Sequence, residues 1–429
     1  MAKKGSLTST RSLDRRVVIS GLGVISCCGN DVDSFWRSVR DGVSGIGPIE
    51  SFDASPYVVK IAGEVHNFDP LDYVAAKEAL RQGRFVHYAI AAARQAVEDS
   101  GILNSKTDRY LMGAALGSSA AGFGNLADAF YQLLIEESYK LVDATAIVEA
   151  SAHATTSHVS IEFGLKGPSL SNSTGCVTAL VAVSQAIDTL RSGAAKVMVV
   201  GASEACVSPF TIALLHKLGV LAPGRNGPTT ACRPYDLHRD GLVLSEGAAV
   251  LVLETARHAM DRGAHIYGEV LSAGYACEAH HMVIAKPTGE ELAEAFRFAM
   301  AEARIAPSDI DYVCSHGIGN RQYDEADTRA LKMALGDHAY RIPVSSIKPV
   351  TGQAFAAAGG MQAIAALMAM AENIVPPTLN LDTPDPTCDL DYVPGKARHS
   401  RVDVVAINAH SFGGAHGAML LRRFDPASN

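Results

Sequence analysis

The sequence lacks the cysteine spacing of a metal site or of a disulfide-stabilised fold. Its eight cysteines are scattered along 429 residues, and no two form a C-x-x-C pair. This pattern predicts neither zinc binding nor a dense disulfide framework. An excess of basic residues is also missing, since 45 acidic and 37 basic residues give a formal charge of -8. We therefore expect reduced thiols, a cytoplasmic protein, no metal, and no broad binding to nucleic acid or anionic membranes.

Segments typical of export or of membrane insertion are lacking too. Residues 1–15 are basic and polar without an apolar core, so they are predicted to be a flexible tail rather than a signal peptide. The longest apolar stretch begins at Ala354, is rich in alanine and glycine, and contains Gln362. Because alanine favours lipid only weakly, we predict a core helix here and no membrane partner.

Short runs of β-branched residues alternate with segments of helical periodicity, and this alternation predicts an α/β fold. No Pro- or Ser-rich linker divides the chain. We therefore predict two α/β halves that share one core, residues 16–262 and 263–429, although no sequence repeat demonstrates a duplication. The predicted strands are the runs that begin at Arg16, Lys196, Ala249, Asp311, Arg341 and Val402. A helix is predicted from Phe85 to a stop at Gly101, and a long surface loop over residues 222–242.

Cys176 lies between an extended run and a run of helical periodicity, "VTALVAVSQAIDTLRSG". This position predicts a thiol at a helix N-terminus, where unpaired N–H groups and the helix dipole favour the thiolate. A buried structural cysteine is the alternative, because free cysteine is common in protein cores. The residues around Cys176 alone do not separate the two interpretations.

Three later stretches place polar or flexible residues directly after predicted strands. In "CSHGIGN" the glycines after His316 allow a turn that leaves the imidazole exposed at a strand end. "SSIKPVTGQ" carries Lys348 and Gln353. "NAHSFGGAHGA" offers backbone N–H groups around Phe412. Together with Cys176, these stretches indicate one catalytic constellation.

The opening "GLGVIS" is not a convincing dinucleotide-binding pattern. A third glycine is missing, and no suitably placed acidic residue follows about twenty residues later. No nucleotide cofactor is therefore predicted from it.

The order of these motifs resembles the β-ketoacyl-acyl-carrier-protein synthases of the thiolase superfamily, most nearly the elongating branch of fatty-acid and type II polyketide synthesis. The resemblance extends from "VVISGLGVISCCGN" at Val17 through "RFVHYAIAAAR", "TGC", "ACRPYDLHRDGLVLSEGA", "HG" and "K-x-x-x-G" to "FGG". It implies a five-layered α/β/α/β/α fold with two similar halves. It also implies an acyltransferase that condenses an acyl thioester, held on Cys176, with malonyl-carrier protein after decarboxylation.

Roles for individual residues follow from the same resemblance. It implies catalytic positions at Cys176, His316, Lys348 and Gln353, and an oxyanion hole formed by the backbone N–H groups of Cys176 and Phe412, with Phe412 also acting as a gate. It further implies that Asp324, Asp327 and His410 position the catalytic groups without contacting the substrate. Capping of the following helix is the alternative for the two aspartates. The resemblance implies no metal or organic cofactor, because the substrates are carried on the phosphopantetheine of an acyl carrier protein.

Several positions depart from the family pattern. Gln353 stands where the elongating branch has a second histidine, and its amide can donate a hydrogen bond but cannot carry a proton. His410 replaces a usual phenylalanine and His416 a common asparagine, and a hydrogen-bonded structural role is the alternative to a functional one for both. Because the second histidine is missing, two other functions stay open. One is a chain-length-factor-like subunit of a ketosynthase heterodimer, and the other is an acyltransferase without decarboxylation. The sequence does not decide between a homodimer and a heterodimer.

Overall fold

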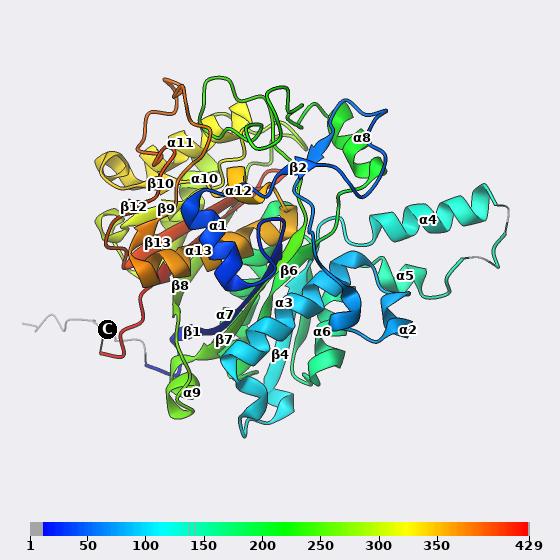
Figure 1. Cartoon of the computed structure of the whole chain (residues 1–429). Coiled ribbons are helices and arrows are strands. Elements are labelled where there is room, and N and C mark those ends of the chain that lie inside the picture. Colours follow the sequence, from blue (N-terminus) through cyan, green and yellow to red (C-terminus); the bar gives the residue numbers. More distant parts are fainter. Residues whose placement is uncertain (1–11, 137, 141, 428–429) are drawn as a thin grey trace, which may run out of the picture.

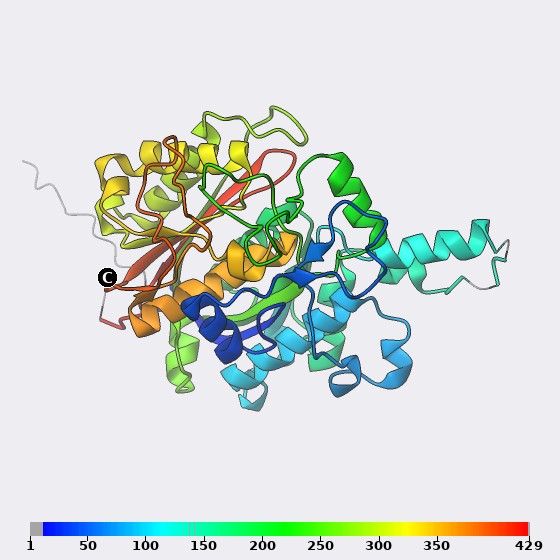
Figure 2. The same ribbon diagram turned by 45° about the horizontal axis from the view of Figure 1, so that its top comes forward.

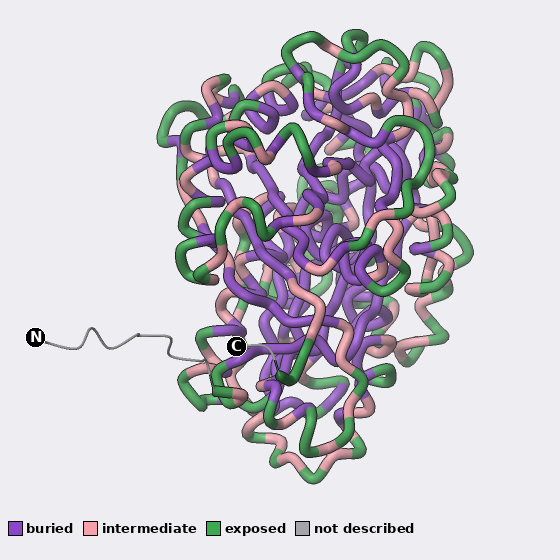
Figure 3. The backbone as a smooth tube through the Cα atoms, turned by 90° about the vertical axis from the view of Figure 1, so that its left-hand side faces the viewer, coloured by how far each residue is buried: buried purple, intermediate pink, exposed green. Residues whose placement is uncertain are grey.

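The structure is a computed structural model that describes residues 12–136, 138–140 and 142–427. The greater part of the predicted basic tail, residues 1–11, lies outside this range. Ten strands form one large mixed sheet in the order β10-β9-β13-β14-β8-β1-β7-β6-β4-β5. Figure 1 shows helices covering the sheet, and Figure 3 shows buried segments filling the middle of the molecule. The predicted α/β class is confirmed.

The sheet consists of two five-stranded halves with the same pattern of pairing. In each half, the three strands nearest the sheet edge pair in parallel. The next two pairings toward the centre of the sheet are antiparallel. The duplication that the sequence could not demonstrate is therefore present in the topology. The first half contains β1 (Val17–Ser26), β4 (Met112–Gly117), β5 (Ser169–Asn172), β6 (Val197–Glu204) and β7 (Gly247–Thr255). The second contains β8 (Gly268–Cys277), β9 (Tyr312–Cys314), β10 (Val344–Ser345), β13 (Val404–His410) and β14 (Ala415–Arg422).

The two halves meet where β1 pairs with β8 over Val17–Ile19. The division predicted after residue 262 falls between the last strand of the first half and the first strand of the second, and it stays a prediction. The other strands form two separate two-stranded sheets. One consists of β2 (Gly47–Pro48) and β3 (Ile61–Ala62), and the other of β11 (Ile374–Val375) and β12 (Arg398–His399).

Helices form three layers around the two halves of the sheet. In the middle layer, α7 (Thr178–Arg191) and α13 (Ala358–Glu372) contact each other and strands of both halves. On the outer faces, α3 (Arg84–Ser100) and α6 (Ala154–Phe163) cover the first half, and α10 (Glu290–Ala303) with α11 (Arg321–Leu335) covers the second. This arrangement is the five-layered α/β/α/β/α fold that the resemblance implied.

The remaining helices lie at the edges and in connections. They are α1 (Val32–Asp41), α2 (Ala76–Ala79), α4 (Phe123–Leu134), α5 (Ala146–Glu149), α8 (Pro209–Lys217), α9 (Ala256–Asp261) and α12 (Lys348–Thr351). Figure 2 shows α4 extending away from the body of the molecule. Residues 222–242 form no helix or strand, as predicted for a long loop.

The glycines of "GLGVIS" have a packing role. A Cβ atom built on Gly21 would lie 2.1 Å from the carbonyl oxygen of Ala96, and one on Gly23 would lie 1.9 Å from that of Ala92. Both positions therefore require glycine, because the backbone of α3 approaches β1 too closely for a side chain. This accounts for the motif without a nucleotide.

The apolar stretch from Ala354 is the core helix that the sequence predicted. The segment Phe355–Glu372 is long and apolar enough to span a membrane by length and composition, but 83% of it is buried inside the protein. Gln362, its polar residue near the middle, is fully buried as well. Burial within the fold accounts for its apolar character.

Candidate active site

Cys176 lies in a 3₁₀ turn, Gly175–Val177, that leads from β5 into α7. Its predicted place at a helix N-terminus is confirmed, but the expected preference for the thiolate is not. Burial raises the pKa of the thiol to about 12, although a hydrogen bond from Gln353 and the charge of Lys348 act in the opposite direction. The loss of hydration outweighs the helix terminus because the side chain is only 5% exposed. The thiol is therefore the favoured form of Cys176.

Gln353 contacts the nucleophile directly. Its side-chain Nε2 donates a hydrogen bond to Cys176 Sγ over 3.1 Å. Its backbone N–H donates to the carbonyl oxygen of Val243 over 2.8 Å, which fixes the chain beyond α12. The other amide atom, Oε1, is buried and has no hydrogen-bond partner within the described part of the chain. The structure therefore gives Gln353 a donor aimed at the sulfur and leaves its acceptor unused.

His316 follows β9 at the predicted position, but it is buried rather than exposed. Only 1% of the residue is accessible, and its ring stacks on that of His410 with centroids 5.2 Å apart. Burial lowers the pKa of His316 well below its ordinary value, and the neighbouring His410, Lys348 and His416 lower it further. His316 is therefore a neutral imidazole, which holds one donor and one acceptor nitrogen.

Gly317 allows the turn after His316, as the sequence predicted. Its φ is +22°, and a Cβ atom there would lie 2.6 Å from the hydroxyl of Tyr235. Only glycine fits this position, because both the dihedral angle and the contact exclude a side chain. The tight turn places the histidine ring at the end of the strand.

Lys348 is buried next to this group, at the first residue of α12. Its Nζ donates to Gln362 Oε1 over 3.1 Å, and burial lowers the pKa of the ammonium group. Gln362 in turn donates through Nε2 to the carbonyl oxygens of Cys314, Ser315 and Asn408. The amide of Gln362 therefore ties the lysine to the ends of β9 and β13. Sequence analysis noted Gln362 only as a polar residue in an apolar run.

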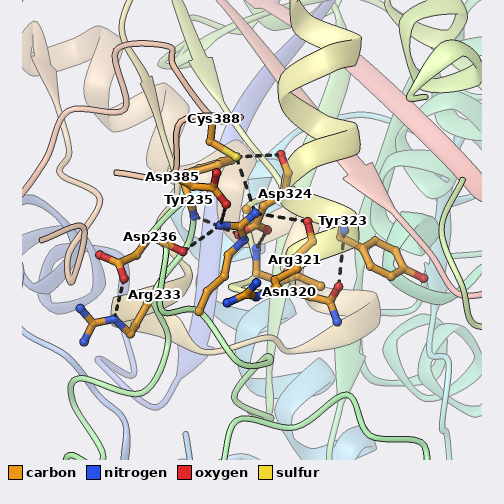
Figure 4. A network of polar contacts seen from close by, with 12 residues as sticks. Arg233, Tyr235, Asp236, Asn320, Arg321, Tyr323, Asp324, Asp385 and Cys388 are labelled. Carbon is orange, nitrogen blue, oxygen red and sulfur yellow. Dashed lines mark hydrogen bonds and ion pairs between the residues drawn. The ribbon is translucent and has the colours of Figure 1, made fainter. Parts of the chain in front are cut away.

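Asp324 supports the His316 loop from α11. Its Oδ1 accepts the backbone N–H of Ile318 over 3.0 Å, and its Oδ2 accepts that of Tyr235 over 2.9 Å. Burial raises the pKa of Asp324 to about 6, although Arg239, with Nε 3.5 Å from Oδ2, lowers it. Figure 4 shows Asp324, Tyr235 and Cys388 together in this network.

Asp327 holds the same loop one turn further along α11. Its Oδ2 accepts the hydroxyl of Tyr235 over 2.6 Å and lies 3.4 Å from the backbone nitrogen of Gly317. Its Oδ1 accepts Asn408 Nδ2 over 2.7 Å. The alternative role in helix capping does not apply, because the side chain of Asn320 caps α11 by accepting the N–H groups of Gln322 and Tyr323. The implied supporting role of the two aspartates agrees with these contacts.

His410 and His416 lie near the end of the β13–β14 hairpin, directly opposite each other. His416 Nε2 bonds to Glu278 Oε1 over 3.0 Å, so this histidine has the hydrogen-bonded role that we considered as an alternative. His410 differs, because neither of its ring nitrogens has a hydrogen-bond partner among the described residues. Its Nε2 lies 3.6 Å from Asp327 Oδ1.

A cavity of about 340 Å³ opens beside Cys176. Most of its surface is apolar, and Cys176, Phe412 and one face of α8 line it. Such a space suits the hydrocarbon part of an acyl chain. Its lining residues are Ser119, Ala120, Phe123, Ser173, Gly175, Cys176, Thr211, Leu214, Leu215, Leu218, Phe355, Ser411 and Phe412.

The two N–H groups of the implied oxyanion hole are not equally available. The N–H of Cys176 donates to Ser411 Oγ over 3.2 Å. The N–H of Phe412 has no hydrogen-bond partner in the described ranges, and its ring lies near those of Phe355 and Tyr323. The Ser411 hydroxyl thus occupies the hydrogen-bonding direction that a thioester oxygen would need. Ser411 could not be recognised from the sequence, because a serine in a glycine-rich loop is ordinary.

Replacing Ser411 with alanine is expected to speed acylation of Cys176 about twofold to tenfold. The change removes a hydrogen bond of about 0.5–1.5 kcal/mol that the incoming thioester must displace. Stopped-flow measurement of acyl transfer from a carrier protein tests this, with Ser411→Thr as a control that keeps the hydroxyl. An unchanged or slower rate in Ser411→Ala would mean that the hydroxyl assists the reaction.

The described part of the chain has no arrangement of side chains suited to binding a metal ion. No cluster of three or more His, Cys, Asp or Glu side chains there could hold a metal ion. All eight cysteines are free thiols.

The chain is similar to known condensing enzymes along its whole length. The family described as "Beta-ketoacyl synthase, N-terminal domain" matches residues 14–259, and "Beta-ketoacyl synthase, C-terminal domain" matches residues 267–382. The "3-oxoacyl-[acyl-carrier-protein] synthase 2" of Synechocystis sp. is 36% identical, over 96% of this chain and 98% of the relative. The "Granaticin polyketide putative beta-ketoacyl synthase 1" of Streptomyces violaceoruber is 40% identical, over 97% and 100%.

The chain is also similar to solved structures of ketosynthases. A type II polyketide synthase acyl carrier protein in complex with its ketosynthase, bound to the hexaketide, aligns with a TM-score of 0.89 and 30% identity. The ishigamide ketosynthase/chain length factor aligns with a TM-score of 0.89 and 29% identity. Both alignments cover 96% of this chain and 100% of the matched chain.

Proposed function

The chain belongs to the β-ketoacyl synthase family, and from this premise we propose how its own residues perform the family's carrier-dependent condensation. We propose that Cys176 takes the acyl chain, that His316 and Gln353 stabilise charge on the malonyl thioester, and that Lys348 balances charge in the buried site. The observation that carries this proposal is the 3.1 Å hydrogen bond from Gln353 Nε2 to Cys176 Sγ. It puts an amide donor at the reacting sulfur, where the elongating branch has histidine.

The first half-reaction transfers an acyl group from the carrier's pantetheine sulfur to Cys176. The Cys176 sulfur attacks the thioester carbon, the bond from that carbon to the pantetheine sulfur breaks, and the thiol proton goes to the departing sulfur. The cavity of about 340 Å³ receives the hydrocarbon chain. Burial raises the pKa of the Cys176 thiol to about 12, so we propose that the proton leaves as the new bond forms rather than beforehand.

The second half-reaction forms the carbon–carbon bond. Malonyl-carrier protein loses carbon dioxide, and the electron pair of the broken bond becomes the enolate of an acetyl thioester. The enolate carbon attacks the acyl group on Cys176, and the bond from that group to Cys176 Sγ breaks. The released thiolate takes one proton from solvent, because the thiol is its stable form here. The product is longer by two carbons and remains on the carrier.

His316 and Gln353 act where negative charge develops on the malonyl thioester oxygen. A neutral imidazole and an amide can each donate one hydrogen bond to it. For Gln353 this requires Nε2 to turn from Cys176 Sγ to the substrate once the sulfur is acylated and is a poorer acceptor. Its unpartnered Oε1 leaves the amide free of a second hydrogen bond that would oppose such a turn.

Two other roles agree less well with these contacts. A chain-length-factor-like subunit does not require a cysteine at the mouth of an acyl cavity, and this chain has Cys176 there. An acyltransferase without decarboxylation does not require a neutral His316 beside the nucleophile. Each role predicts a different result in the measurement of carbon dioxide release described below.

We propose that a second ketosynthase-type chain and an acyl carrier protein are the partners, that substrates arrive on phosphopantetheine without a further cofactor, and that the enzyme works in the cytoplasm. Matched structures include a carrier-bound ketosynthase and a ketosynthase/chain length factor. Strand β5 lies at an edge of the sheet, where another chain can add a strand. Helix α4 exposes large apolar side chains nearby: Phe123, Phe130, Tyr131, Leu133 and Leu134.

The proposal predicts that the purified chain alone releases one carbon dioxide for each chain extended. The measurement uses acyl-carrier protein together with malonyl-carrier protein labelled in its free carboxyl group. Turnover only after addition of a homologous partner would support a heterodimer. Acyl transfer without carbon dioxide release would contradict the condensing function and support a plain acyltransferase.

A further inference from the structure

Three imidazoles and two carboxylates lie together around the end of β13, where His410 precedes Ser411, whose hydroxyl accepts the N–H of Cys176. The rings of His316 and His410 stack at 25° with centroids 5.2 Å apart, and the ring of His416 meets that of His410 edge-on at 4.8 Å. Asp327 and Glu278 lie at the outer sides of this group. The proposed reaction uses His316 and leaves His410 without a role.

The two stacked rings differ in their carboxylate neighbours. His410 Nε2 lies 3.6 Å from Asp327 Oδ1, which is beyond hydrogen-bond distance but within the range of an ion pair. His316 has no ion pair with a carboxylate in the described ranges, and its Nδ1 is buried without a partner. Two imidazoles in contact disfavour holding two protons, because the charges would repel each other. The Asp327 carboxylate lies beside the ring of His410 and not beside that of His316.

Charge on His316 would oppose decarboxylation. A cationic imidazolium would stabilise the malonyl carboxylate, which carries the negative charge before reaction. During the reaction this charge moves to the thioester oxygen, so an interaction with the carboxylate is lost in the transition state. A neutral donor does not bind the ground state in this way. Gln353, the other proposed donor, is neutral at every pH.

We propose that His410 is a positioning residue for carbon–carbon bond formation, which acts through His316 by keeping that imidazole uncharged while the enolate forms. This inference rests on the proposed function. His410 itself does not line the cavity that contains Cys176. Its effect on the substrate is electrostatic and passes through the adjacent ring.

His410 affects the pKa of two neighbouring residues, His316 and Asp327. His410 lowers the pKa of His316, after burial, and it lowers the pKa of Asp327 against the opposite effect of burial. The titratable and charged groups around His410 come from every element packed against it. They are His316 after β9, Tyr323 and Asp327 on α11, His416 on β14, Glu278 after β8, and Lys348 on α12.

The test follows the protonation of His316 in the full-length protein by NMR of ¹³C-labelled histidine, with the signal assigned through a His316→Gln variant. In the wild type, His316 is expected to stay neutral between about pH 5 and pH 8. In His410→Phe and in His410→Gln, His316 is expected to begin taking up a proton at a higher pH than in the wild type. Phenylalanine fills the space of the ring, and glutamine keeps a polar group facing Asp327, so the proposal does not depend on the folding of one variant.

The rate of carbon dioxide release should follow the same change. Between about pH 8 and pH 5.5, the rate in both variants is expected to fall about tenfold more than in the wild type, because a larger share of His316 is charged at the lower pH. His416→Asn is the graded control and should give a smaller shift, because His416 has the weaker effect on His316. A merely structural role of His410 would instead lower the rate equally at every pH.

The outcomes separate this inference from the proposed function. If His316 keeps one chemical shift across the range in both His410 variants, or if their loss of rate does not depend on pH, the inference is wrong. If the wild type releases no carbon dioxide, the proposed function fails, and the NMR titration still decides whether His410 controls the charge of His316.

Discussion

Replacing Cys176 with alanine is expected to lower the rate of condensation by about 10⁴-fold or more and to abolish the covalent acyl adduct. Without the sulfur, no thioester can form, and the acyl chain stays on its carrier. The stability of the fold should change little, because the side chain loses one sulfur atom next to a cavity. Intact-protein mass spectrometry after incubation with an acyl-carrier protein measures the adduct directly.

The matched control for Cys176→Ala is Cys277→Ala. Cys277 is an exposed free thiol, so it is the site at which non-specific acylation would occur. The Cys277→Ala variant should acquire the adduct like the wild type. An adduct of equal mass and equal rate in Cys176→Ala would contradict the assignment of the nucleophile.

Replacing Gln353 with leucine is expected to slow carbon–carbon bond formation about 10²–10³-fold. Leucine is of similar size but removes the Nε2 donor, and loss of one oxyanion donor has an effect of this magnitude. Acylation of Cys176 should be affected far less, although loss of the hydrogen bond to Sγ leaves the thiol pKa higher still. Single-turnover measurement of each half-reaction separates the two effects.

Gln353→His is the control for this prediction, because it restores a ring donor at the same position. Its rate of bond formation is expected to lie within about tenfold of the wild type, whereas that of Gln353→Leu is not. Equal rates in Gln353→Leu and the wild type would mean that the amide takes no part in charge stabilisation.

The motifs of the sequence predicted which residues meet in the site. Cys176 and Gln353 are 177 positions apart in the chain and form a direct hydrogen bond. Their meeting could be expected because the order of the motifs resembles one family. The α/β class and the core helix after Ala354 were predicted from β-branched runs and apolar composition.

The charge states and the finer contacts could not be predicted. Position at a helix terminus favours a thiolate, but the burial that raises the pKa of Cys176 depends on residues distant in sequence. Burial likewise reverses the expected exposure of His316. Strands β4 and β5 were missed because "MGAALG" and "SLSN" are rich in small or polar residues rather than β-branched ones. Ser411 and Gln362 became visible only through their hydrogen bonds.

The most direct test is the intact mass of the wild type and of Gln353→His after acyl-carrier protein and then malonyl-carrier protein are added. Our account predicts that the Cys176 adduct forms in both proteins and that malonyl-carrier protein discharges it into a chain longer by two carbons. A wild-type adduct that persists until Gln353 is changed to histidine would contradict this account. It would mean that the protein holds or transfers acyl chains but does not condense them.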